Sequence, residues 1–123
     1  MIKIKVQLFG GRGVGSTRIR IVRGFPTTLN QDQQKKHWAW HNNYIPGRSR
    51  VILTASELQK LINQYSGQKS NHWITPNKER INFGKPIGYW RDTKTGKEYE
   101  TSWGILHYSK KGPHVIPANP HQY

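Results

Sequence analysis

The sequence contains no cysteine, which excludes disulfide bridges, thiolate metal sites and cysteine nucleophiles. No apolar run reaches transmembrane length, and the first residues lack the apolar core of a signal peptide. Acidic residues are few: 6 Asp and Glu stand against 20 Lys and Arg, for a formal net charge of +14. A zinc site is therefore not expected, because thiolates are absent and carboxylates are scarce.

The excess of positive charge predicts a polyanionic partner, since it raises the free energy of the compact chain through self-repulsion. Nucleic acid is the first candidate and an anionic membrane the second. The basic residues are spread along the chain and no amphipathic basic helix stands out, which argues against the membrane. The 5 Trp and 6 Tyr could stack on bases, although most of them are needed for the core.

A length of 123 residues fits one domain. We divide the chain into a basic, glycine-containing N-terminal arm or hairpin (residues 1–34), the main domain (residues 35–120) and a tail (residues 121–123). Within the arm, residues 2–9 alternate like a strand, and residues 17–22 alternate again and could pair back with it. The intervening residues 10–16 lack the Gly-Lys-Ser/Thr ending of a phosphate loop, so we interpret them as a flexible connector.

One helix is strongly indicated and a second, shorter one is suggested. Residues 30–40 are polar, then rich in histidine and tryptophan, and fit a short helix. The clearer helix begins with a capping box at residues 54–57, where Thr54 and Glu57 can satisfy free amides of the first turn. An apolar stripe follows at Leu58, Leu61, Ile62 and Tyr65, and Gly67 is placed to end the helix.

The second half of the chain is typical of strands. Apolar and aromatic segments separated by turn-forming residues occur at 80–83, 87–90, 99–106 and 115–116, with a hairpin loop at 92–97. Helices followed by an antiparallel sheet predict an α+β fold, with one or two helices packed on a C-terminal antiparallel sheet of about four strands.

The last hairpin has two chemically different faces. If residues 110–113 form its loop, Ser109 lies opposite His114 and His107 lies opposite Ile116. Because side chains alternate along a strand, His107, Ser109 and His114 then share one face. The other face carries apolar and aromatic residues: Leu106, Tyr108, Val115 and Pro117. The polar face combines imidazoles, a hydroxyl and nearby lysines, although polar residues facing water would give the same pattern.

The segment from about residue 35 to residue 120 resembles the type-50 polymorphic toxin domain of bacteria and their prophages. The most specific match is residues 104–112, followed by residues 114–118. Shorter matching pieces are residues 36–37, 42–44, 77–80, 83–84 and 87–88. After His37 the family tends to have a small turn, where this chain has Trp40 and His41.

The resemblance implies a ribonuclease of the barnase, EndoU, colicin and RelE-like group, in which a helical N-terminal part packs on an antiparallel sheet. Metal-independent RNA cleavage uses the ribose 2′-hydroxyl as nucleophile, so it needs a general base, a general acid and cations around the phosphate. Histidine suits both proton transfers because its pKa lies near neutrality. No cofactor is expected.

The expected catalytic pair is His107 and His37, in either order, with His114 as the alternative second histidine. Lys110 or Arg80 would stabilise the phosphate, and Ser109 and Thr101 would position it. Further contacts to nucleic acid are expected from Lys36, Arg48, Arg50, Thr101 and Lys111.

Structural roles compete with these assignments. His37 could cap a helix or stack on a neighbouring tryptophan, and His107 could be a buried structural histidine. The lysines at the hairpin tip could be solvated, and Arg80 could simply pair with a carboxylate. His72 and His121 lie in polar surroundings and receive no role.

Two functions remain open from the sequence. The first is a metal-independent endoribonuclease toxin that cleaves cellular RNA, with tRNA as one candidate. The second is a catalytically silent, phage-encoded basic module that binds nucleic acid or inhibits a host protein. An immunity protein or another phage or host protein is the expected protein partner, and no membrane partner is expected. The expected location is the cytoplasm, or wherever another domain or a virion delivers the chain.

Overall fold

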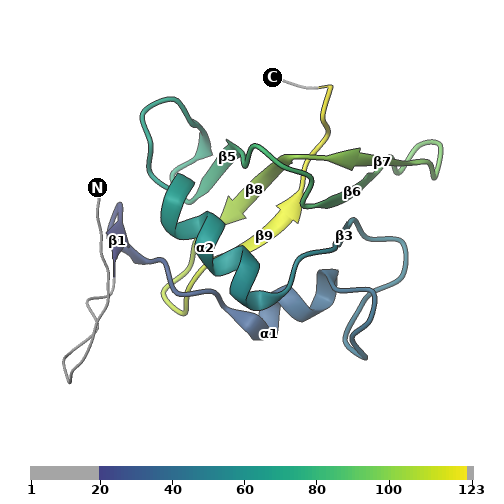
Figure 1. Cartoon of the computed structure of the whole chain (residues 1–123), viewed down its shortest axis with the longest axis horizontal. Coiled ribbons are helices and arrows are strands. Elements are labelled where there is room, and N and C mark those ends of the chain that lie inside the picture. Colours follow the sequence, from purple (N-terminus) through teal and green to yellow (C-terminus); the bar gives the residue numbers. More distant parts are fainter. Residues whose placement is uncertain (1–19, 122–123) are drawn as a thin grey trace.

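The computed structural model describes residues 20–121 and confirms the predicted α+β fold (Figure 1). Within these residues, no helix has the length and apolar character needed to cross a membrane. The helices are α1 (Gln31–Gln34), the 3₁₀ turn η1 (Lys35–His37) and α2 (Ala55–Tyr65). The strands are β1 (Ile21–Val22), β2 (Phe25–Pro26), β3 (Arg50–Val51), β4 (His72–Thr75), β5 (Lys78–Asn82), β6 (Gly88–Arg91), β7 (Glu98–Thr101), β8 (Trp103–His107) and β9 (His114–Pro117).

The main sheet is antiparallel with the strand order β4-β5-β8-β9, which confirms the prediction of about four C-terminal strands. Its membership differs from the expectation. The first strand, β4, was not predicted, and β6 and β7 instead pair with β3 in a separate sheet of order β3-β6-β7.

The predicted strand 99–106 is in fact two strands that belong to different sheets. The break falls at Ser102, where the Thr101 hydroxyl accepts a hydrogen bond from the Trp103 amide (3.0 Å). The same hydroxyl donates to the Ala118 carbonyl (2.9 Å), which ties the break to the segment after β9. A continuous run of strand-forming residues therefore concealed a change of sheet.

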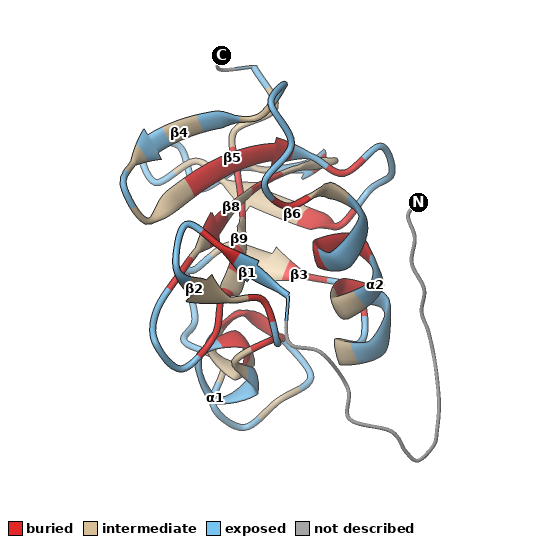
Figure 2. Cartoon of the chain, turned by 90° about the vertical axis from the view of Figure 1, so that its left-hand side faces the viewer, coloured by how far each residue is buried: buried red, intermediate tan, exposed pale blue. Residues whose placement is uncertain are grey.

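The helix α2 forms as its local sequence predicts. The Thr54 hydroxyl accepts from the Glu57 amide (3.2 Å), and the Glu57 carboxylate accepts from the Thr54 amide (2.9 Å). The helix buries Leu58, Leu61 and Ile62 in the core. At its end Gly67 adopts φ +77°, a left-handed conformation that glycine tolerates best. Figure 2 shows that the outer side of α2 faces solvent while its inner side is buried.

The end of α2 is anchored to the main sheet by a buried carboxylate. Glu79 on β5 has no exposed surface, and it accepts hydrogen bonds from the Gly67 amide (2.9 Å) and the Asn71 side chain (2.9 Å). The Tyr108 hydroxyl donates to the same carboxylate (2.7 Å). Burial and this neighbouring carboxylate raise the pKa of Tyr108, so the phenol remains a donor.

An N-terminal hairpin is present among the described residues, and it joins residues 21–22 to residues 25–26. Strand β1 pairs with β2 through Ile21 opposite Pro26 and Val22 opposite Phe25. The predictions for residues 2–9 and 10–16, and the first part of 17–22, lie outside the described residues.

The register of the closing hairpin corrects the prediction. His107 pairs with His114, and Ile105 pairs with Ile116, so the connection runs from residue 108 to residue 113. The predicted pairs, Ser109 with His114 and His107 with Ile116, were wrong by two residues. A shift of two residues keeps every side chain on its face, so the expected shared face of His107 and His114 is confirmed, and Leu106 and Val115 are fully buried on the other.

Candidate functional site

Three imidazoles that are distant in sequence lie together at one side of the main sheet. The ring centroids of His107 and His114 are 5.1 Å apart. The ring of His37 stacks on that of His114 with a centroid separation of 6.1 Å. The cluster therefore joins η1, β8 and β9, and it contains both of the predicted catalytic histidines and the predicted alternative.

A buried glutamine brings the first histidine to the other two. Gln34 has no exposed surface, and its side chain donates to the Val115 carbonyl (2.8 Å) and accepts from the Val115 amide (2.6 Å). The amide group thus pairs with β9 as a neighbouring strand would, at the edge where β9 has no further strand in the main sheet. His37 follows one turn later and so reaches His114.

The hydrogen bond of His37 fixes its tautomer. The ring nitrogen Nδ1 lies 2.9 Å from the Ser49 carbonyl oxygen, which can only accept. Nδ1 therefore carries the proton, and Nε2 of the neutral ring is an acceptor. With 3% of its surface exposed, His37 is the most buried of the three imidazoles.

The surroundings favour neutral imidazoles. Burial, followed by the positive charge of Lys78 and the proximity of His37, lowers the pKa of His107 to about 4. Burial, followed by the other two histidines, Lys36 and Arg48, lowers the pKa of His114 to about 4. Burial also lowers the pKa of His37, with an opposing contribution from its bond to Ser49.

No carboxylate contributes to these shifts, so the described part of the cluster is a site of bases and cations. A bound anion would supply the missing negative charge and would raise the pKa of the imidazoles that it touches. The cluster is therefore electrostatically suited to an anionic ligand that delivers or stabilises a proton.

A hollow of about 450 Å³ opens beside the cluster. His107 and His114 line it, whereas His37 does not, because it lies behind His114. The rim is formed by the connection between β8 and β9, with Ser109, Lys110 and Lys111 exposed. The remaining lining residues are Asn30, Gln33, Asn77 and Tyr108.

The Ser109 side chain holds the loop in shape. Its hydroxyl donates to the Gly112 carbonyl (2.9 Å) and accepts from the Lys111 amide (3.2 Å). Gly112 is needed because a Cβ at that position would lie 2.1 Å from the Thr28 carbonyl oxygen, and its φ is +105°. The Lys110 and Lys111 side chains are thereby presented at the edge of the hollow.

The other predicted cations have different positions. Lys36 and Arg48 lie close enough to act electrostatically on His37 and His114. Arg80 is on the same face of the sheet, yet its guanidinium lies over Trp103 (4.5 Å) and donates to the Asn119 carbonyl (2.9 Å). Arg50 contacts Glu98 at 3.3 Å. Arg50, Arg80 and Thr101 are not among the residues that line the hollow.

Two residues at the site were missed by sequence reasoning. Lys78 is the strand partner of His107, and Asn77 lines the hollow while its side chain donates to the Tyr108 carbonyl (3.3 Å). Both belong to the segment 77–80 on which the family resemblance partly rests. Lys78 is two residues from Arg80 in one strand, and this spacing could have indicated that the two cations share a face.

The unusual turn after His37 is built around stacked tryptophans. Trp38 donates from its indole nitrogen to the Leu53 carbonyl (2.9 Å) and stacks on the exposed Trp40 at a centroid separation of 5.7 Å. His41 accepts at Nδ1 from the Asn43 amide (3.1 Å). His37 and His41 are four residues apart in sequence, but the helical turn ends at His37, so they do not share a helical face. Within residues 20–121, no group of His, Asp and Glu side chains has an arrangement that could hold a metal ion.

Comparison with known proteins identifies the family. No curated protein matches the chain. The model of the family described as bacterial toxin 50 matches residues 29–117, a span that contains every element from α1 to β9 and all three clustered histidines. The chain therefore belongs to the bacterial toxin 50 family, as the resemblance of its sequence predicted, and the matched span is a toxin domain.

Proposed function

We propose that this toxin domain cleaves RNA without a metal ion, at the hollow beside His107 and His114. The single observation that carries the proposal is the convergence of two imidazoles, 5.1 Å apart, on a hollow rimmed by lysines. Two bases within reach of one phosphate, with cations around them, are the groups that internal transesterification of RNA requires.

In the proposed reaction the ribose 2′-oxygen attacks the adjacent phosphorus and the bond from phosphorus to the 5′-oxygen breaks. One imidazole takes the 2′-hydroxyl proton, and the other, protonated, gives a proton to the leaving 5′-oxygen. The products are a 2′,3′-cyclic phosphate and a free 5′-hydroxyl, with no change of oxidation state. Each proton transfer typically accelerates such a reaction by about 10²–10⁴-fold.

His107 and His114 are assigned to the proton transfers because both line the hollow. His37 is assigned a positioning role, since it is buried, bonded to the Ser49 carbonyl and stacked on His114. The proposed pair is therefore His107 with His114, which was the alternative in the sequence analysis, and not His107 with His37. Lys110 and Lys111 line the hollow and are the cations best placed to stabilise charge on the phosphate, whereas Lys78 lies beside His107 as its strand partner.

The lowered pKa values of His107 and His114 determine which form of each imidazole meets the substrate. In the free protein both imidazoles are neutral at pH 7, since their pKa values lie at about 4. The general acid must therefore gain its proton as the phosphate approaches. Because kcat/KM reports ionisation of the free enzyme, its pH optimum is expected below the ordinary histidine value of about 6.5.

The test is incubation of the purified protein with total RNA in EDTA. We expect cleavage with cyclic phosphate ends, and a fall in kcat/KM of about 10²–10⁴-fold in His107→Ala and in His114→Ala. His72→Ala is the matched control, because His72 is exposed on the edge strand β4. RNA left intact by the parent protein, or full activity in both histidine variants, would contradict the proposal and favour a nucleic-acid-binding or protein-inhibiting module.

A separate pair of variants tests the role of His37. Loss of activity in His37→Ala should be partly restored in His37→Asn, whose amide can donate to the Ser49 carbonyl as the imidazole does. The pH optimum of the restored activity should equal that of the parent. If asparagine restores nothing while the variant is folded, His37 itself transfers a proton.

A further inference from the structure

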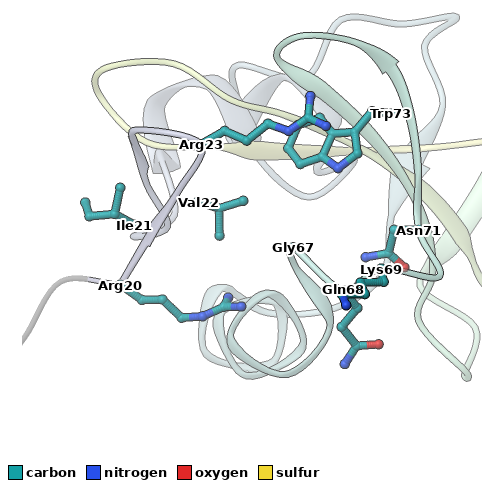
Figure 3. A pocket seen from close by; sticks show the side chains of 9 residues that line it. All are labelled: Arg20, Ile21, Val22, Arg23, Gly67, Gln68, Lys69, Asn71 and Trp73. Atoms are coloured by element: carbon teal, nitrogen blue, oxygen red, sulfur yellow. The ribbon is translucent and has the colours of Figure 1, made fainter.

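A second hollow, of about 520 Å³, lies beside the N-terminal hairpin (Figure 3). Its walls come from β1 and its turn, from the loop that follows α2, and from Trp73 on β4. None of its lining residues belongs to the histidine cluster, and neither sequence motif nor family resemblance had pointed to it.

Three cations and no carboxylate line this hollow: Arg20, Arg23 and Lys69. Within residues 20–121, none of the three forms an ion pair. Arg20 is held in place by hydrogen bonds to Ser66 at the end of α2, one of them to the carbonyl at 2.5 Å. Gln68 and Asn71 also line the hollow, but their side-chain amides donate within the protein: Gln68 to the Gln64 carbonyl (2.8 Å), and Asn71 to the Tyr65 carbonyl (2.7 Å) and the Glu79 carboxylate (2.9 Å). The three cations therefore carry the positive character of the lining. An anionic, hydrogen-bonding ligand fits such a lining.

Arg23 adopts a conformation that its residue type disfavours. Its φ is +51°, and Gly24 follows with φ +84°, so both central residues of the β1–β2 turn are left-handed. Turns of this kind favour Asn, Asp or Gly at the first position. The arginine is nevertheless present, and its guanidinium lies 3.8 Å from the centroid of the Trp73 ring. Local backbone strain of this kind is concentrated at functional sites in proteins.

A pair of stacked rings lies between the two hollows. Tyr108 lines the histidine hollow and Trp73 lines the second one, and their centroids are 5.3 Å apart at an interplanar angle of 21°. Figure 1 places the β1–β2 hairpin and the β8–β9 connection at the same end of the molecule. One extended chain could therefore occupy both hollows.

We propose that the second hollow binds the continuation of a single-stranded RNA whose scissile phosphate lies at the histidines. This inference rests on the proposed function and specifies its substrate as unpaired and several nucleotides long. Arg20 and Lys69 bind phosphates, and the guanidinium on Trp73 offers donors to a phosphate and a plane to a base. Stacking of this kind needs splayed, unpaired bases, which a duplex does not present.

The experiment measures fluorescence anisotropy of 2′-O-methyl oligonucleotides, which cannot be cleaved through the 2′-oxygen. We expect a ten-nucleotide strand to bind the parent protein at least tenfold more tightly than a three-nucleotide strand. Arg23→Asn and Lys69→Asn should each reduce that gain by about tenfold. Asparagine at position 23 suits the left-handed turn, so Arg23→Asn should unfold no more easily than the parent. Lys94→Asn, in the β6–β7 loop at the far end, is the matched control for charge.

The outcomes separate this inference from the proposed function. The second site would be overturned if affinity did not increase from the three-nucleotide to the ten-nucleotide strand. It would also be overturned if that increase were the same in the parent, Arg23→Asn and Lys69→Asn, even if RNA is cleaved. If the increase in affinity depends on Arg23 but the protein cleaves no RNA in EDTA, the second site is supported and the proposed function is contradicted. Equal binding of a ten-base-pair duplex would overturn the single-strand assignment. Tighter binding of polyglutamate than of RNA, with the same dependence on Arg23, would assign the surface to an acidic protein instead.

Discussion

At the scale of single residues, the site depends on imidazoles that folding holds in their neutral form. His107 and His114 are partly buried and face cations rather than carboxylates, so protonation is opposed both by desolvation and by like charge. A bound anion, such as the phosphate of the proposed substrate, would remove the second of these obstacles. The same arrangement couples the stability of the free protein to pH.

The pH dependence of stability follows from this coupling. Between the folded-state pKa values of about 4 and the unfolded value of about 6.5, the unfolded chain binds more protons than the folded chain. The stabilisation is therefore complete above about pH 7 and is lost as pH falls toward 4. We expect the free energy of unfolding to drop by about 2 kcal/mol between pH 7.5 and pH 5, allowing for partial exposure.

Urea unfolding at several pH values measures this effect. In the double variant His107→Gln, His114→Gln the two titrating groups are gone, so the fall between pH 7.5 and pH 5 should be much smaller. A parent protein with the same stability at both pH values would show that the imidazoles titrate normally.

Residue types were easier to predict from the sequence than their partners. His107 and His114 were placed on one face because alternation along a strand depends only on parity, which a two-residue register error preserves. Lys78 was missed because its proximity to His107 arises from the pairing of β5 with β8. The loop between β8 and β9 was predicted as residues 110–113 but runs from residue 108 to residue 113. Its shape depends on the close approach of Gly112 to the distant Thr28 carbonyl.

At the scale of elements, Gln34 links the short helix to the edge of the main sheet. Its side chain makes both hydrogen bonds that Val115 would otherwise leave unpaired in the interior. The position of His37 relative to His114 depends on this link. Nothing in the local sequence indicates it, since a glutamine in a polar helix is usually exposed.

Replacement of this glutamine by leucine tests the link. Gln34→Leu introduces an apolar side chain of similar size but leaves the amide and carbonyl of Val115 without hydrogen-bond partners. We therefore expect a loss of about 2–4 kcal/mol in the free energy of unfolding. RNA cleavage should fall even at temperatures where the variant is folded.

Gln31→Leu, at an exposed position of the same helix, is the matched control. Chemical denaturation of both variants measures the difference. A Gln34→Leu protein as stable and active as Gln31→Leu would show that the link is dispensable.

Elements with strong local signals were predicted well, and elements defined by distant contacts were not. The capping box and apolar stripe identify α2 because both lie within one segment. Strand β4 was missed because none of its four residues is buried, and Trp73 packs through its stacking contact with the distant Tyr108. The division of strands between two sheets depends on Ser102, where the sequence carries no glycine or proline to mark the break.

At the scale of the whole molecule, the cations that line the two hollows lie toward the same end. The histidine hollow, the lysines of the β8–β9 connection and the arginine-lined hollow lie toward one end, where the N-terminal hairpin packs (Figure 1). Arg50 and Arg91 pair with Glu98, whereas Lys35 pairs with Asp32 on the short helix that leads to His37. If the protein binds RNA as proposed, these cations would contribute to attracting it to the end that carries the imidazoles.

The most direct test of the account is cleavage of a deoxyribonucleotide strand that contains a single ribonucleotide, in EDTA. The account predicts one cut, on the 3′ side of that ribose, with a 2′,3′-cyclic phosphate product in the parent protein and none in His107→Ala. No cut, or cuts at deoxyribose positions, would contradict it, because the proposed nucleophile exists only at the ribose.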